Sequence, residues 1–126
     1  MRRSTGCAAT SPPAEKITAR GTLSGMVLEV ALIDVTPGSE DAFVAAYQSA
    51  SHLVSSTPGC HSVRMTHGIE TPSRFVLLVE WESVEAHERN FRQSERFGQW
   101  RAAIGPHFAA PPHVEHFTDV PVTAIA

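Results

Sequence analysis

Residues 75–104 read FVLLVEWESVEAHERNFRQSERFGQWRAAI, and this stretch decides the fold. It begins with an apolar run whose β-branched and aromatic side chains predict a strand over residues 74–81. Ser83 and Ser94 have a residue type that is preferred at helix N-termini, and apolar side chains follow each of them at helical spacing. A buried strand followed by two short helices is therefore expected.

The flanking sequence adds three strands and one helix. Residues 26–35 are a nearly continuous β-prone run. A helix is expected to start after Ser39, since apolar side chains recur at helical spacing until Thr57-Pro58-Gly59 breaks the pattern. Residues 60–69 alternate between apolar and polar side chains, and residues 113–122 return to a β-like composition, so each segment predicts a further strand.

The predicted order is strand, helix, strand, strand, helix pair, strand. Two β-α-β halves in this order form the split βαβ or ferredoxin-like fold, an α+β fold with an antiparallel sheet and helices on one face. Val76 and Leu78 point to the opposite face from Leu77 and Val79, so both faces of the sheet are apolar. One layer of helices covers only one face, and a homodimer is the simplest cover for the other.

The chain of 126 residues suffices for a single domain. We expect this domain at residues 26–122, after a disordered tail at 1–25 and before a short tail at 123–126. The net charge of -3 argues against a nucleic-acid or anionic membrane surface, and no apolar run approaches the roughly 20 residues that span a bilayer. Cys7 and Cys60 form no disulfide framework, so a reducing cytoplasm is the expected location.

Three polar side chains interrupt the apolar stripes. His67 lies on the apolar face of a predicted strand, His87 lies in a helical stripe, and Arg101 follows Trp100 in the last helix. An apolar surface with a few convergent polar groups is typical of a small-molecule pocket. A lone inward histidine is also common in ordinary cores, and Trp81 serves equally well in a core or in a pocket wall, so the structural alternative stays open.

The run FVLLVEWESVEAHERNF, with the preceding helix and the Pro58-Gly59-Cys60 turn, resembles the antibiotic biosynthesis monooxygenase domain of the dimeric α+β barrel superfamily. The resemblance covers about residues 26 to 120, and its nearest functional pattern is that of the cofactor-free anthrone oxygenases. Two departures matter. His87 stands where those enzymes have a tyrosine, and Leu77 stands where they have an asparagine.

The resemblance implies a monooxygenase that oxidises an anthrone, phenol or quinol with O2, without metal or flavin. In this hypothesis His67 accepts the substrate proton with His87 as the alternate, Arg101 holds the resulting anion, and Trp81 stacks on the ring. Five further side chains are expected to line the substrate pocket: Tyr47, Leu77, Phe91, Phe97 and Trp100.

Other functions remain open. The Leu77 departure favours a second hypothesis, a small-molecule-binding or accessory dimer without turnover. A haem-degrading role is disfavoured, because the first strand has no asparagine and FGQWRAAI has no histidine. No metal site is expected either, since His113 and His116 point to opposite faces of a strand and Glu115 lies on the His113 side.

Overall fold

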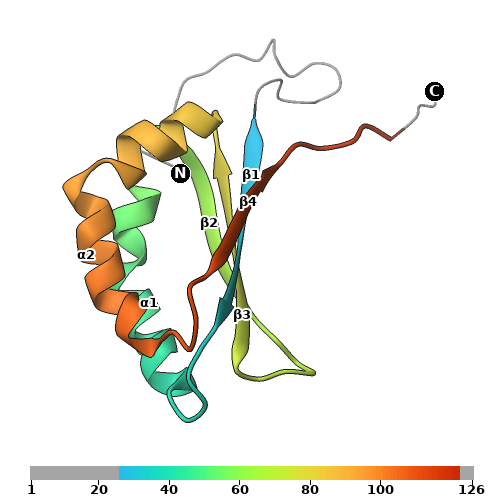
Figure 1. The fold of residues 1–126 in the computed structure, drawn as a ribbon. Helices are drawn as coiled ribbons and strands as arrows, with labels where there is room; N and C mark the ends of the chain where they lie inside the picture. The colour runs from blue at the N-terminus through green and yellow to red at the C-terminus, as the bar shows by residue number, and fades with distance from the viewer. Residues whose placement is uncertain (1–25, 123–126) are drawn as a thin grey trace.

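The computed structural model describes residues 26–122, and its elements follow the predicted order. The elements are β1 (Val27–Asp34), α1 (Glu40–Ser55), β2 (Cys60–His67), β3 (Arg74–Trp81), η2 (Ala86–Arg92), α2 (Glu95–Ile104), η3 (Gly105–His107) and β4 (His113–Phe117). The four strands form one antiparallel sheet in the order β2-β3-β1-β4, and the helices lie on one side of it (Figure 1). The predicted α+β class and ferredoxin-like topology are confirmed.

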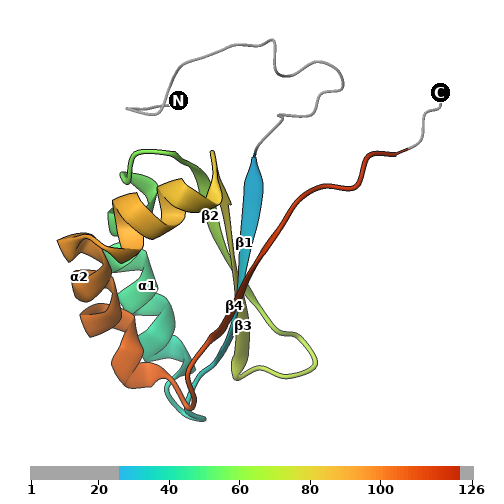
Figure 2. The same cartoon turned by 45° about the horizontal axis from the view of Figure 1, so that its top comes forward.

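Strand alternation sorts the side chains of the sheet into two faces. On β1 the buried positions are Glu29, Ala31 and Ile33, and on β3 they run from Phe75 to Trp81 at every second residue. These positions face the helical layer, and the apolar ones form the core with the apolar side of the helices. Turning the molecule keeps both helices on the same side of the sheet (Figure 2). Within residues 26–122, no helix is long and apolar enough to cross a membrane.

Three strands are shorter than predicted, and β1 is shorter by one residue at each end of its predicted span 26–35. β2 ends at His67, because Gly68 donates its N–H to the Arg74 carbonyl and the chain turns, leaving Ile69 86% exposed. β4 ends at Phe117, which pairs with Leu28, so only Val27 of β1 remains beyond this pair. The predicted tails at 1–25 and 123–126 lie outside the described residues.

The first of the two late helices is a π-helix, although the sequence predicted an ordinary α-helix. Its turns are wide, and Gln93 donates its backbone N–H to the carbonyl of Glu88, five residues earlier. Ser83 caps the helical turn at 84–85 that leads into η2, because its hydroxyl accepts a hydrogen bond of 3.0 Å from the Ala86 N–H. Ser94 occupies the cap position of α2, but its hydroxyl donates to the Phe91 carbonyl instead.

The turn between α1 and β2 fixes the position of η2. Gly59 has a φ of 93°, a conformation that glycine adopts without strain. A Cβ at this residue would lie 2.6 Å from the Cβ of Ala86, so only glycine allows η2 to approach this closely. Asn90 donates a hydrogen bond of 2.7 Å to the Pro58 carbonyl and holds η2 against the same turn.

Candidate active site

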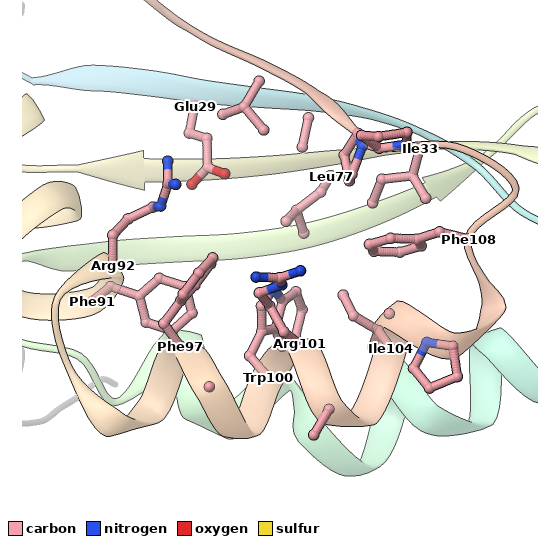
Figure 3. Close-up of a pocket in the computed structure, with 18 of the residues that line it drawn as sticks. Glu29, Ile33, Leu77, Phe91, Arg92, Phe97, Trp100, Arg101, Ile104 and Phe108 are labelled. Atoms are coloured by element: carbon pink, nitrogen blue, oxygen red, sulfur yellow. The ribbon is translucent and has the colours of Figure 1, made fainter.

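A cavity of about 1080 Å³ lies between the inner face of the sheet and α2 (Figure 3). η2 bounds one end of it, and the segment at 105–112 bounds the other. Apolar side chains dominate its wall: Ile33, Leu77, Phe91, Phe97, Trp100, Ile104 and Phe108. A concave apolar space of this size suits a small organic molecule.

Four polar side chains reach this cavity, namely Glu29, His87, Arg92 and Arg101. The guanidinium carbons of Arg92 and Arg101 lie 5.0 and 5.8 Å from the centre of the Phe97 ring, so two cations flank one aromatic side chain. Arg101 extends from α2 toward the sheet, whereas Glu29 and Arg92 lie at the η2 end (Figure 3). Among residues 26–122, Arg101 makes no ion pair.

A buried carboxylate anchors the polar end of the cavity. Trp81 donates its indole N–H to Oε1 of Glu29 over 2.9 Å, and Nε2 of His87 lies 3.4 Å from the same oxygen. The His87 ring also stacks on Trp81, with ring centres 4.9 Å apart and planes 17° apart. Trp81 therefore orients both neighbours, and among the described residues nothing donates a hydrogen bond to Oε2 of Glu29.

The second nitrogen of His87 is also engaged. Nδ1 lies 2.8 Å from Nε2 of His116, which reaches it from β4. Glu29 and His116 are partners in the β1–β4 ladder, so their side chains lie next to each other on the inner face. Both nitrogens of His87 thus point at protein groups, and neither is left to contact a ligand in the cavity.

Burial shifts the pKa values of Glu29 and His87. It raises the pKa of Glu29 above its ordinary value, and the Trp81 hydrogen bond and the Arg92 charge offset this only in part. Burial lowers the pKa of His87 to about 4, with His116 and Arg92 acting in the same direction. His87 is therefore a neutral imidazole at neutral pH, and its contact with Glu29 is then no ion pair.

Three side chains have the geometry closest to a metal site. Ligand-type atoms of His87, Glu88 and His116 lie within 4.8 Å of one another in the described part of the chain. Two nitrogens that each lie 2.0–2.1 Å from a tetrahedral ion would be about 3.3 Å apart. The 2.8 Å between the two imidazoles is a hydrogen-bond length, so we interpret the pair as bonded to each other.

The cavity brings together six of the nine site residues named from the sequence: Leu77, His87, Phe91, Phe97, Trp100 and Arg101. Trp81 is fully buried behind the cavity wall, and Tyr47 packs edge-on against Trp100 at 6.1 Å. His67 is exposed at the end of β2, where Nε2 lies 2.6 Å from the Pro72 carbonyl and the ring stacks on Phe75. It does not line the cavity.

Sequence reasoning missed Glu29, Arg92 and His116. The available signal for Glu29 was an acidic residue inside the apolar run VLEVALID, at a position that alternation turns inward. Its partner Trp81 lies 52 residues away in the sequence, so no local pattern connects the two. Arg92 gave no signal, because its place beside the cavity depends on the π-helical geometry of η2.

Comparison with known proteins supplies a family. The sequence model of the antibiotic biosynthesis monooxygenases matches residues 26–103. YczJ, an uncharacterized protein of Bacillus subtilis (strain 168), is 34% identical over 95 residues, which are 75% of this chain and 100% of YczJ. A 42.8 kDa protein in the whiE locus of Streptomyces coelicolor is 31% identical over 85 residues, which are 64% of this chain and 21% of that protein.

Solved structures agree with this match. A protein of Bordetella bronchiseptica that is assigned as an antibiotic biosynthesis monooxygenase is 43% identical, with a TM-score of 0.74 over 77% of this chain and 99% of its own. A variant of SnoaB, a cofactor-independent oxygenase from Streptomyces nogalater, is 15% identical, with a TM-score of 0.68 over 79% of this chain and 97% of its own. The second likeness is one of fold.

Proposed function

This chain belongs to the antibiotic biosynthesis monooxygenase family, and on that premise we propose that it oxidises an electron-rich aromatic compound with O2, without metal or flavin. The observation that carries the proposal is an apolar cavity with a buried carboxylate, Glu29, at one end and the guanidinium of Arg101 on the facing helix. Such a site can accept a proton from an apolar substrate and bind the anion that results.

The walls fit a flat aromatic molecule. Phe91, Phe97 and Trp100 present rings from η2 and α2, and Leu77 presents an apolar surface from β3. Arg101 stands among these groups, where it can donate hydrogen bonds to a phenolate or enolate oxygen. Arg101 is exposed in the described chain, so this charge interaction strengthens only when a bound ligand displaces water from the guanidinium.

Glu29 is the proton acceptor that we propose. Its Oε1 is held by Trp81, while Oε2 has no hydrogen-bond donor among the described residues and is available to a substrate. Burial raises the pKa of this carboxyl, which makes its ionised form a stronger base than an ordinary glutamate. His87, the alternate base predicted from the sequence, has both nitrogens engaged and supports Glu29 instead.

The reaction balances without a second reductant. For an anthrone it reads R2CH2 + O2 → R2C=O + H2O, and the substrate itself supplies the electrons. Removal of one C–H proton leaves its electron pair on the substrate anion, which reduces O2 and forms a C–O bond. Loss of the second C–H proton then breaks the O–O bond, and the departing oxygen leaves as water. The protein binds the ring, holds the anion and moves the protons.

Oxygen uptake with anthrone in metal-free buffer tests this proposal. Glu29→Gln and Arg101→Gln are each expected to lower kcat/KM by about 100-fold, while Glu80→Gln, an exposed carboxylate on β3, should leave it unchanged. His67→Ala belongs in the same series. If His67→Ala lowers kcat/KM and Glu29→Gln does not, His67 is the base, as the sequence predicted, and the assignment of Glu29 is wrong.

A second function is favoured by one observation, the apolar Leu77 in the cavity wall where the resembling oxygenases have a polar side chain. It is a small-molecule-binding or accessory dimer without turnover. Thermal stabilisation by anthrones and quinols with no oxygen uptake would select this alternative. In either function we propose a cytoplasmic homodimer.

A further inference from the structure

We propose that Glu29, His87 and His116 form a relay that carries the substrate proton out of the cavity to solvent. In this proposal His116 takes part in proton transfer, although it contacts no substrate. The inference rests on the proposed function in one respect only, which is that Glu29 receives the proton.

The three groups form a continuous line from three elements. Oε1 of Glu29 on β1 lies 3.4 Å from Nε2 of His87 on η2, and Nδ1 of His87 lies 2.8 Å from Nε2 of His116 on β4. Exposure rises along the line. Glu29 and His87 are 6% and 2% exposed, whereas His116 is partly exposed. The line therefore begins in the cavity and ends at a group that water reaches.

The surrounding structure holds this line in place. The β1–β4 register sets Glu29 and His116 side by side on the inner face, and the His87 ring bridges them from η2. Trp81 fixes two of the three members, because it donates to Glu29 and stacks on the His87 ring. Contacts such as the one of 3.4 Å are often long without substrate and shorten when it binds.

The proton moves by exchanging partners along the line. Glu29 first takes the C–H proton of the substrate, and the electron pair stays on the substrate anion. The protonated carboxyl turns and gives its proton to Nε2 of His87, while Nδ1–H of His87 passes its own proton to Nε2 of His116. His116 then releases a proton from Nδ1 to water, and Glu29 is again a carboxylate.

A neutral imidazole suits the middle position, because one of its nitrogens donates while the other accepts. The low pKa of His87 keeps it neutral at neutral pH. Within residues 26–122, the other charged groups that act on Glu29 or His87 are Arg92 and Glu88 on η2. The positive charge of Arg92 disfavours protonation of His87 to the imidazolium. Glu88 forms a 3.9 Å ion pair with Arg92.

Such a relay would prevent the proton on Glu29 from returning to the substrate anion. A proton that stays on Glu29 lies next to the substrate anion and recombines with it before O2 reacts. Moving that proton to His116 keeps the anion available. Replacing His116 should therefore trap the proton inside the cavity without preventing its first removal.

Deuterium exchange into anthrone, measured without O2 in D2O, tests the relay apart from oxidation. Wild-type protein should catalyse exchange at the methylene carbon, because the relay replaces the removed proton by deuterium from solvent. His116→Gln should lower that catalysed rate by about tenfold or more. His113→Gln is the matched control on the same strand, since His113 is exposed and pairs with Glu115.

Chemical rescue separates proton transfer from a structural role. Added imidazole should restore exchange in His116→Ala in proportion to its concentration, and a variant that had merely lost packing would not respond. Exchange at the wild-type rate in both His116 variants would overturn the relay. Absence of exchange in the wild-type protein would overturn both Glu29 as base and the relay. Exchange without any oxygen uptake would remove the proposed oxidation and leave the relay standing.

Discussion

At the scale of single residues, the buried pair Glu29 and His87 determines how the protein handles protons. Strand alternation and helical spacing predicted that His67, His87 and Arg101 face one apolar region, and the cavity contains His87 and Arg101 but not His67. The same reasoning failed for Glu29 and His116. Both residues act through contacts with residues that are distant in the sequence. These contacts depend on the register of the folded sheet, which no local sequence pattern specifies.

His87 should make the fold sensitive to acid. Its pKa falls from 6.5 in the unfolded chain to about 4 in the fold, so the unfolded chain binds more protons between these values. Stability that is fully present above pH 6.5 is therefore lost as the pH falls toward 4, by up to about 3 kcal/mol. The raised pKa of Glu29 acts oppositely, since its contribution is lost as the pH rises.

His87→Phe keeps an aromatic ring beside Trp81 and removes the titrating group. Urea unfolding at pH 6.5 and pH 4.5 should show a smaller loss of unfolding free energy in this variant than in the wild-type protein. His61→Gln, an exposed histidine on β2, should retain the wild-type loss. An equal loss in all three proteins would mean that the imidazole of His87 does not set the acid response.

At the scale of elements, the placement of η2 decides whether the site exists. A π-helix spaces residues five apart along one side, and this brings both His87 and Arg92 to the cavity. The sequence predicted the start of this segment through Ser83 but not its wide turns. Hydrophobic spacing over so few residues does not distinguish α from π geometry, and the choice follows from packing against Gly59 and Pro58.

Gly59→Ala should therefore cost more stability than the same change at Gly38. Both residues have a positive φ, of 93° and 95°, so each substitution introduces backbone strain of about 1 kcal/mol. A methyl group at position 59 also overlaps the Ala86 side chain, whereas nothing lies within 4 Å of one at position 38. The overlap should add about 1–3 kcal/mol, measured by urea unfolding.

A double-mutant cycle with Ala86→Gly identifies the cause. Removing the Ala86 methyl group should recover part of the loss in Gly59→Ala and none of the loss in Gly38→Ala. If the two alanine variants unfold with equal free energies, or if the second change recovers nothing, the close approach of η2 does not explain the need for glycine at this turn.

At the scale of the whole molecule, the sheet has one face that its own helices leave uncovered (Figure 1, Figure 2). On β1 and β3, alternation and the strand register place five apolar side chains on this outer face: Leu28, Val30, Leu32, Val76 and Leu78. All five are only partly buried within residues 26–122. The sequence predicted this face from the apolar residues on both sides of β3, and an apolar sheet face of this kind favours association with a second copy.

Leu78→Lys tests the homodimer directly. Leu78 lies on β3, an inner strand of the sheet, so a lysine there would place a charge within the proposed interface. We expect the dissociation constant, measured by sedimentation velocity over a range of protein concentrations, to rise at least about tenfold. Ile69→Lys is the control, because Ile69 lies in the exposed turn after β2 and outside this face. Unchanged dimerisation of Leu78→Lys, or a wild-type protein that stays monomeric at high concentration, would show that the outer face is not where two copies meet.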